Sequence, residues 1–157
     1  MSTSKIDFQF EPISALLDEG IADLVEQHWQ EIALDKDEIP LDVDWDKKQL
    51  LEDQGAWKAW VARHNGFLIG YISFYIHEHA INYKSTRYIH DDVFWLHPDY
   101  RNAGVGKAMI QSAIEALPRP SKLQMKVKLT FEGGRVGKLL EHLGLPAVEQ
   151  VHSAYLK

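Results

Sequence analysis

The chain contains no cysteine, no long run of apolar residues and no excess of basic residues. Without cysteine, disulfides, thiolate metal sites and cysteine nucleophiles are excluded, which fits a cytoplasmic protein. No apolar run approaches about 20 residues, the length that a transmembrane helix needs. The first seven residues turn acidic before any stretch long enough for a signal peptide. We therefore expect a soluble, unprocessed cytoplasmic protein that does not act at a membrane.

The excess of charge is acidic, with a formal net charge of −6. Non-specific nucleic-acid binding comes mainly from the neutralisation of phosphates by Lys and Arg, so we do not expect a nucleic-acid partner. The length of 157 residues predicts one domain over residues 1–157. A chain of this size buries roughly 70% of the surface that its unfolded form exposes, which allows a sizeable single core.

Hydrophobic periodicity gives the first half of a secondary-structure prediction. Phe8 and Phe10 alternate as in a short strand, and apolar residues between positions 13 and 28 then recur at helical spacing, although Gly20 weakens that helix. Residues 33–46 carry Pro40 and many acids, which predicts a loop that leads into a short helix around residues 45–53.

Two segments rich in aromatic and β-branched residues follow, at residues 57–63 and 67–76. The pair Asn65-Gly66 between them is the strongest short hairpin signal, so these two segments are predicted to pair antiparallel. Residues 87–96 predict the next strand.

The last third of the chain alternates strand and helix patterns. A helix is predicted to end near Leu117 because the prolines after it cannot continue it. Residues 122–131 alternate as a strand, Gly133-Gly134 opens a helix to Leu143, and residues 147–156 predict a last strand or hairpin. One mixed sheet flanked by helices accounts for this pattern.

The run from Arg101 to Gly106 is the most informative part of the chain. It links an apolar segment that stops at Pro98 to an amphipathic stretch over residues 107–117. A strand that reopens through glycines into a helix leaves backbone N–H groups at a positive helix end, which suits a phosphate or a pyrophosphate. Gly104 and Gly106 let the backbone come close to such an anion.

Three phosphate-binding patterns place glycines near the start of a helix, and this run meets one of them. A P-loop needs Gly at the position of Arg101 and Ser or Thr after Lys107, and the dinucleotide fingerprint needs Gly at the position of Met109. The third pattern, Arg/Gln-x-x-Gly-x-Gly/Ala, is met by Arg101, Gly104 and Gly106. The preceding Leu96-x-Pro98-x-Tyr100 makes this match more specific than a bare glycine pattern.

On these residues, and on the order of its predicted elements, the chain resembles the GNAT superfamily of acyl-CoA-dependent N-acetyltransferases. The resemblance implies an α/β (α+β) fold, in which a mixed, mostly antiparallel central sheet of about six to seven strands is flanked by about four helices. It also implies an acyltransferase that takes acetyl-CoA as cosubstrate and a small-molecule or protein amine as acceptor. Tyr83-Lys84-Ser85 before Asp91-Asp92-Val93 also looks like GNAT proteins of bacteriophages. Family members are often dimers, which suggests a homodimer.

The resemblance also implies which residues bind acetyl-CoA. In the family, backbone N–H groups of the turn hold the pyrophosphate, and the end of the preceding strand binds the pantetheine like an added strand. Carried over, the strand end and the turn comprise Phe94, Trp95, Leu96, Arg101, Asn102, Ala103, Gly104, Val105, Gly106 and Lys107.

The acceptor amine has to lose a proton before it can attack a thioester. A lysine-like amine has a pKa of about 10.4, so it is almost wholly protonated at pH 7 and a general base is useful. The strand Glu that is frequent in the family lies eleven positions before the motif Arg, which is His90 here. Asp92 shares a face with His90 if the strand is regular, with Asp91 on the other face, and a bulge would reverse this. His90 or Asp92 is thus the candidate base, and a hydrogen-bonded polar cluster at the sheet edge is the alternative.

The chain departs from the family at the acid that protonates the leaving thiolate. The usual Tyr falls at Leu140, and the Asn that often opens that helix falls at Gly133. Tyr155 is the candidate replacement, with Tyr83 or water as alternatives. The missing Tyr also leaves open a second function, a non-catalytic CoA-binding or partner-binding module on the same fold.

Between positions 35 and 53, eight acids stand against three bases. In GNAT relatives this connection helps to wall the acceptor site, so its negative field favours a cationic acceptor such as a polyamine, a basic antibiotic, or a protein lysine or N-terminus. The candidate acceptor-binding residues are Glu38, Asp42, Asp44 and Asp91. A solvated acidic loop that confers solubility is the alternative.

The sequence lacks the motifs that would indicate a metal site or a serine hydrolase. His77 and His79 are not part of an HExxH or comparable spacing, so no metal site is predicted. A Ser–His–Asp hydrolase is not expected because the Gly-x-Ser-x-Gly turn is missing.

Overall fold

The computed structural model describes residues 5–157. The first four residues, which are part of the segment predicted not to be a signal peptide, lie outside the described residues. The chain forms two compact units. The first comprises the chain up to Glu19 together with Asp44–Lys126, and the second comprises Gly20–Val43 and Val127–Lys157. Each unit is described by itself.

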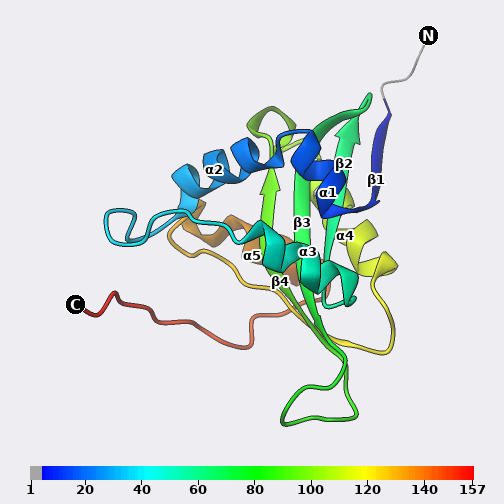
Figure 1. Ribbon diagram of the computed structural model, residues 1–157, viewed down its shortest axis with the longest axis vertical. Coiled ribbons are helices and arrows are strands. Elements are labelled where there is room, and N and C mark those ends of the chain that lie inside the picture. Colours follow the sequence, from blue (N-terminus) through cyan, green and yellow to red (C-terminus); the bar gives the residue numbers. More distant parts are fainter. Residues whose placement is uncertain (1–4) are drawn as a thin grey trace. The chain divides into compact units, whose positions relative to one another are not determined.

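A five-stranded sheet in the order β1-β2-β3-β4-β5 forms the centre of the first unit. The strands other than β5 pair antiparallel, and β5 is parallel to β4. Asn65 and Gly66 form the turn between β2 and β3, as predicted. Figure 1 shows the strands side by side, with the β3–β4 connection projecting beyond them. The strand bounds are Ile6–Glu11 (β1), Trp57–His64 (β2), Phe67–His77 (β3), Tyr88–Leu96 (β4) and Lys122–Gln124 (β5).

Three helices of the first unit cover the two faces of this sheet, and their bounds are Ile13–Asp18 (α1), Trp45–Asp53 (α3) and Val105–Ala116 (α4). Trp60 of β2 donates a hydrogen bond to Ser112 of α4, so its side of the sheet is the α4 face. The side chain of Lys48, on α3, contacts the ring of Trp57 on the opposite side, which is the α3 face. Figure 1 shows α3 in front of the strands and the more distant α4 behind them.

The core of the first unit lies between the sheet and its helices. The strands supply fully buried Val61, Ile72 and Phe74, and α4 supplies Met109 and Ile110. The buried positions of α4 recur at helical spacing, as expected for a helix with one apolar face on a sheet. This packing fixes the start of α4 relative to the end of β4.

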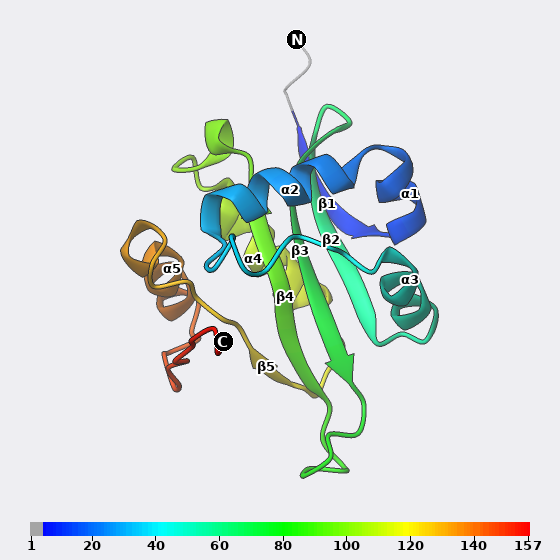
Figure 2. The same cartoon turned by 60° about the vertical axis from the view of Figure 1, so that its left-hand side comes forward.

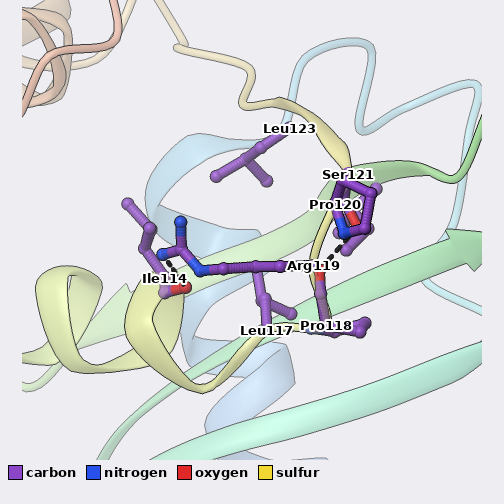
Figure 3. Close-up of a pocket in the computed structure, with 8 residues that line it drawn as sticks. Ile114, Leu117, Pro118, Arg119, Pro120, Ser121 and Leu123 are labelled. Carbon is purple, nitrogen blue, oxygen red and sulfur yellow. Dashed lines mark hydrogen bonds between the residues drawn. The ribbon is translucent and has the colours of Figure 1, made fainter.

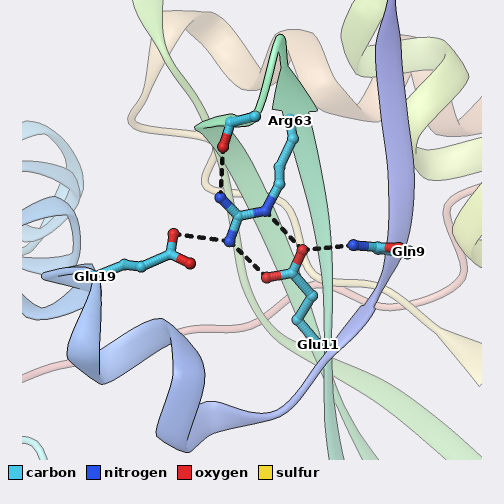
Figure 4. Close-up of polar contacts among 5 residues, drawn as sticks. Gln9, Glu11, Glu19 and Arg63 are labelled. Atoms are coloured by element: carbon cyan, nitrogen blue, oxygen red, sulfur yellow. Dashed lines mark hydrogen bonds and ion pairs between the residues drawn. The ribbon is translucent and has the colours of Figure 1, made fainter.

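An ion-pair network ties β1, β2 and α1 together (Figure 4). Both carboxylate oxygens of Glu11 accept hydrogen bonds from Arg63 at 2.6 Å, and Gln9 donates a further one to Glu11 at 2.8 Å. Glu19, just after α1, lies 2.8 Å from the same guanidinium. The guanidinium lowers the pKa of Glu11, because it stabilises the carboxylate form.

The second unit contains two helices, Ile21–Ile32 (α2) and Arg135–His142 (α5), with a short 3₁₀ turn at Glu132–Gly134 before α5. Leu140 is buried in α5, and His28 is buried in α2. Lys157, the last residue, lies 3.3 Å from Glu38. Among the described residues of the chain, no helix is both long enough and apolar enough to cross a bilayer.

The mixed, mostly antiparallel α/β fold is confirmed, and several predicted bounds are corrected. Gly20 adopts a left-handed conformation (φ 87°), so the predicted helix over residues 13–28 is split into α1 and α2. The strand predicted over residues 122–131 ends at Gln124, and residues 147–156 form no strand. Five strands and five α-helices are therefore observed over residues 5–157, against the six to seven strands and four helices expected.

Candidate functional site

A bulge interrupts β4 where the sequence places its three consecutive ionisable residues. Phe74 of β3 pairs with Asp91, whereas Ile72 pairs with Phe94. One residue of β3 therefore faces two residues of β4, Asp92 and Val93. Because the bulge begins at Asp92, the regular alternation that was predicted for His90 and Asp92 is kept up to that point.

Polar and aromatic side chains gather around Asp92 on the α3 face. The Oδ2 atom of Asp92 accepts hydrogen bonds from Trp57 Nε1 at 3.2 Å and from Ser73 Oγ at 3.3 Å, and Lys48 Nζ lies 2.5 Å away. The Lys48 ammonium also lies 5.0 Å from the Trp57 ring centroid and 5.7 Å from that of Tyr75. Three β-strands and α3 thus contribute to one cluster.

His90 borders this cluster. Its ring lies 5.3 Å from the ring of its cross-strand partner Tyr75, and it stacks on His77 at 5.0 Å. Burial lowers the pKa of His90, and the charges of His77 and Lys126 lower this pKa further. The negative charge of Asp92 raises it, by less than these effects lower it. His90 is therefore a neutral imidazole at pH 7, which is the form that can accept a proton.

Asp91 points to the other face and is buried, with 5% of its surface exposed. Its Oδ1 atom accepts a hydrogen bond from the backbone N–H of Lys126 at 2.8 Å. Burial raises the pKa of Asp91. The structure therefore separates this candidate acceptor-binding residue from His90 and Asp92 and gives it a bond to the segment after β5.

The ladder between β4 and β5 ends early. It comprises Tyr88–Lys122, Ile89–Leu123 and His90–Gln124, and β4 then continues for six residues to Leu96 (Figure 2). Within residues 5–157, no strand pairs with β4 on that side beyond His90. This part of β4 offers a backbone edge on which an extended ligand can form strand-like hydrogen bonds.

The glycine turn follows this edge directly. A 3₁₀ turn over Pro98–Tyr100 leads to Asn102 and Gly104, which both have left-handed backbones (φ 70° and 78°). Gly104 is the N-cap of α4, and a Cβ built on it meets no atom within 4 Å. The turn thus opens onto free space at the positive end of a twelve-residue helix. Such a turn suits a phosphate group, and the open edge of β4 suits an extended ligand.

A pocket of about 400 Å³ lies elsewhere in the first unit (Figure 3). Apolar side chains line most of it, including Ile89 of β4, Leu117 after α4 and Leu123 of β5. Ile89 is seven residues before Leu96, which is about 23 Å along a strand. The pocket therefore lies at the opposite end of β4 from the glycine turn.

The other predicted site residues are distributed over both units. Asp44 caps α3, accepting a hydrogen bond from the backbone N–H of Lys47 at 2.8 Å. Glu38 pairs with Lys157 in the second unit, where Asp42 and Tyr155 are exposed. Phe94, Trp95 and Leu96 end β4, and Trp95 stacks on Tyr71 at 5.8 Å, which supports packing as the role of this side chain.

The comparisons with known proteins identify the family. The model of the acetyltransferase (GNAT) family matches residues 20–133. The chain belongs to this family. It is an acyltransferase, and acetyl-CoA is its cosubstrate. The comparison with curated proteins found no match.

Among solved structures, the chain is similar to a ribosomal-protein-alanine N-acetyltransferase from Brucella melitensis biovar Abortus 2308, with 24% identity, a TM-score of 0.68 and coverage of 97% of this chain and 98% of that one. It is similar to an aminoglycoside acetyltransferase from an uncultured soil metagenomic sample in complex with sisomicin, with 14% identity, a TM-score of 0.63 and coverage of 97% of this chain and 95% of that one. It is also similar to a predicted acetyltransferase with acetyl-CoA from Clostridium acetobutylicum, with 14% identity, a TM-score of 0.58 and coverage of 96% of each chain. These likenesses concern the fold.

Sequence reasoning missed Lys48, Trp57, Ser73 and Tyr75 as neighbours of this acetyltransferase's candidate base. Lys48 is 44 residues from Asp92 along the chain and lies on a mostly polar helix. The alternation of β2 and β3 places Trp57, Ser73 and Tyr75 on one face of the sheet, and the pairing of Tyr75 with His90 brings that face beside the candidate base. That alternation was a usable signal, whereas the contact of Lys48 was not.

Proposed function

We propose that this acetyltransferase moves the acetyl group of acetyl-CoA to a primary amine of a cationic acceptor by direct attack on the thioester. The observation that carries the proposal is the separation of β4 from β5 immediately after His90. It leaves a backbone edge between the candidate base and the glycine turn, so cosubstrate and base share one strand.

The binding of acetyl-CoA is assigned to backbone groups. The turn of Arg101, Asn102, Ala103, Gly104, Val105, Gly106 and Lys107 takes the pyrophosphate, and the edge of Phe94, Trp95 and Leu96 takes the pantetheine. The first amides of a helix have no acceptor within the helix, and the helix dipole favours an anion there. Recognition by backbone groups fits the mixed character of the side chains in this stretch.

His90 is the proposed general base, directly or through a water molecule. It is neutral at pH 7 and only partly buried, so it keeps access to an acceptor on the α3 face.

 Asp92 already accepts three donors, among them the ammonium of Lys48, so it is less suited to accept a further proton. We assign to it the electrostatic support of the site instead.

The reaction takes two protons from the acceptor nitrogen, one before the attack and one as the amide forms, and returns one of them to the sulfur of CoA. The acceptor ammonium gives a proton to His90, the neutral amine attacks the thioester carbonyl carbon, a C–N bond forms and the C–S bond breaks. The thiolate of CoA takes up a proton as it leaves. Tyr155 remains the proposed acid for that step, with water as the alternative, since Leu140 stands where the family has its usual Tyr.

The acceptor is proposed to be cationic. The acids of positions 35–53 outnumber the bases, and Glu38, Asp42 and Asp44 are among them. A similar fold is found in an aminoglycoside acetyltransferase in complex with sisomicin, which supports an acceptor that bears amino groups. A cytoplasmic location and a homodimer belong to the same proposal.

An acceptor screen tests this function. Purified protein is incubated with acetyl-CoA and a panel of polyamines, aminoglycosides, and peptides with lysine or a free N-terminus, and released CoA is measured by a thiol reagent. We expect CoA release with a cationic amine and loss of that release in His90→Ala, with acetyl-CoA affinity little changed. No release with any amine, despite binding of acetyl-CoA, would refute the proposed transfer.

A further inference from the structure

The ammonium of Lys48 lies in a site that the sheet builds around it. The Asp92 carboxylate is 2.5 Å from Lys48 Nζ. The rings of Trp57 on β2 and of its cross-strand partner Tyr75 on β3 have their centroids 5.0 and 5.7 Å from the same Nζ. A carboxylate and two aromatic rings that meet at one point attract an alkylammonium through the charge of the carboxylate and the quadrupoles of the rings. The arrangement is therefore that of a binding site for an organic cation.

The walls of this site are fixed by the sheet. Trp57 and Ser73 are buried, with 3% and 2% of their surface exposed, and both donate to Asp92 Oδ2. These two donors are neutral, so they orient the carboxylate and leave its negative charge in place. A cation that enters this site finds its partner already positioned.

The occupant, by contrast, comes from a helix that contributes no buried residue to the core. The side chains of Lys48 and Asp92 are 18% and 20% exposed, so solvent reaches the pair. A soluble ammonium can therefore replace the Lys48 ammonium without passing through the core.

The site also lies where the proposed reaction takes place. The Tyr75 ring faces both the Lys48 ammonium and the His90 ring, at 5.7 and 5.3 Å. Asp92 is four residues before Leu96, about 13 Å along the strand, which is within reach of an extended pantetheine arm that starts at the glycine turn.

We propose that Asp92, Trp57 and Tyr75 bind the ammonium group of the acceptor, and that Lys48 fills this site when no acceptor is bound. The ligand class is a primary alkylammonium: an amino group on a flexible aliphatic chain, as in a polyamine or a lysine side chain. This inference rests on the proposed function, because it names the substrate subsite of the same reaction.

The test is to vacate the site and to offer it a small cation. In Lys48→Ala, n-butylammonium should bind about tenfold more tightly than in the wild type, as measured by calorimetry and by tryptophan fluorescence, because the competing ammonium is gone. n-Butanol, which has the same chain without the charge, should show no such gain. Lys47→Ala is the matched control, because Lys47 is exposed on the same helix. Lys47→Ala should bind n-butylammonium with the same affinity as the wild type.

Two double variants test the walls. Lys48→Ala combined with Asp92→Asn should bind n-butylammonium no more tightly than the wild type. Lys48→Ala combined with Tyr75→Leu should bind it several-fold more weakly than Lys48→Ala alone. The second double variant provides the test if the first does not fold. Equal binding of n-butylammonium by wild type and Lys48→Ala, or a gain that survives both double variants, would overturn the inference.

A third measurement separates this inference from the proposed function. With saturating acetyl-CoA, n-butylamine should have a higher kcat/KM in Lys48→Ala than in the wild type. Binding of the cation without CoA release from any amine would refute the transfer and leave the ammonium site standing. CoA release by the wild type without any gain in cation binding would do the reverse.

Discussion

The guanidinium Nε of Arg101 donates a hydrogen bond to the backbone carbonyl of Leu96 at 2.8 Å. The first residue of the motif therefore holds the last residue of β4, so the strand edge and the glycine turn are fixed relative to each other. Positioning of this kind reduces the conformational freedom that a ligand has to remove when it binds both parts.

Arg101→Ala should accordingly weaken acetyl-CoA binding by roughly three- to tenfold, the range that corresponds to the loss of one hydrogen bond. Arg101→Lys keeps the charge and should show an intermediate loss, because the ammonium cannot reproduce the geometry of the guanidinium. Calorimetric titration with acetyl-CoA measures both. Unchanged affinity in Arg101→Ala would mean that the turn keeps its position without this bond.

Gly104→Val should abolish acetyl-CoA binding. The left-handed backbone at Gly104 (φ 78°) makes a β-branched side chain unfavourable by about 1–2 kcal/mol, and the side chain would occupy the space at the start of α4. Gly66→Val is the matched control, because Gly66 is also left-handed (φ 87°) and open but lies in the β2–β3 turn. Both variants should lower Tm, and only Gly66→Val should keep the Tm increase that acetyl-CoA gives the wild type. A retained increase in Gly104→Val would move the pyrophosphate site elsewhere.

Local signals predicted much of this fold. The bounds of α3 and the turn at Asn65-Gly66 agree with the structure, because each depends on residues next to one another in the chain. The helix α4 begins at Val105, two residues before the amphipathic stretch predicted from residue 107. The strand predicted over residues 122–131 did not extend past Gln124, since alternation shows that a segment can form a strand but not that a partner is present.

The candidate site was predictable only in part. The shared face of His90 and Asp92 followed from the period of a strand, and the bulge lies where it does not disturb that period. The contact between Lys48 and Asp92 joins residues 44 positions apart, so it depends on how α3 packs on the sheet. The sequence pattern does not indicate how α3 packs on the sheet.

The pH dependence of transfer should follow His90. Because its pKa is lowered, kcat/KM for the amine should rise with pH to a first plateau with a midpoint below about 6.5, the ordinary pKa of His. His77→Ala removes a neighbouring positive charge that disfavours protonation of His90, so the midpoint should move to higher pH. His79→Ala is the control, since His79 bonds to the backbone of Lys84 and should leave the midpoint in place. A midpoint that stays the same in His77→Ala would assign the titration to another group.

Glu11→Gln should destabilise the fold by about 1–3 kcal/mol at pH 7, because hydrogen bonds to charged groups are lost between β1 and β2. The folded pKa of Glu11 is below its unfolded value of about 4.3, so the contribution is complete above that value and is lost as the pH falls through the folded pKa. Urea unfolding from pH 7 to pH 3 should therefore show the difference from wild type shrinking in acid. Asp7→Asn, which removes an exposed pair with Lys5, should leave the free energy of unfolding nearly unchanged.

The acidic residues between α2 and α3 should steer a cationic acceptor. With saturating acetyl-CoA, kcat/KM for the best amine should fall as the salt concentration rises, because exposed charges are screened within about 10 Å at 0.1 M. Asp42→Asn together with Asp44→Asn should lower kcat/KM at low salt and weaken the salt dependence. Asn is also a good N-cap, so the second substitution removes charge while keeping the cap of α3.

A charge-matched control decides between steering and solubility. Glu115→Gln together with Glu141→Gln removes the same total charge from α4 and α5. If the acids act only through net charge, both pairs should change the rate equally. Steering by the acidic residues predicts a loss with the Asp pair alone, greatest at low salt and absent for an uncharged amine analogue. An equal salt dependence in the wild type and the Asp42/Asp44 variant would remove these residues from the acceptor's path.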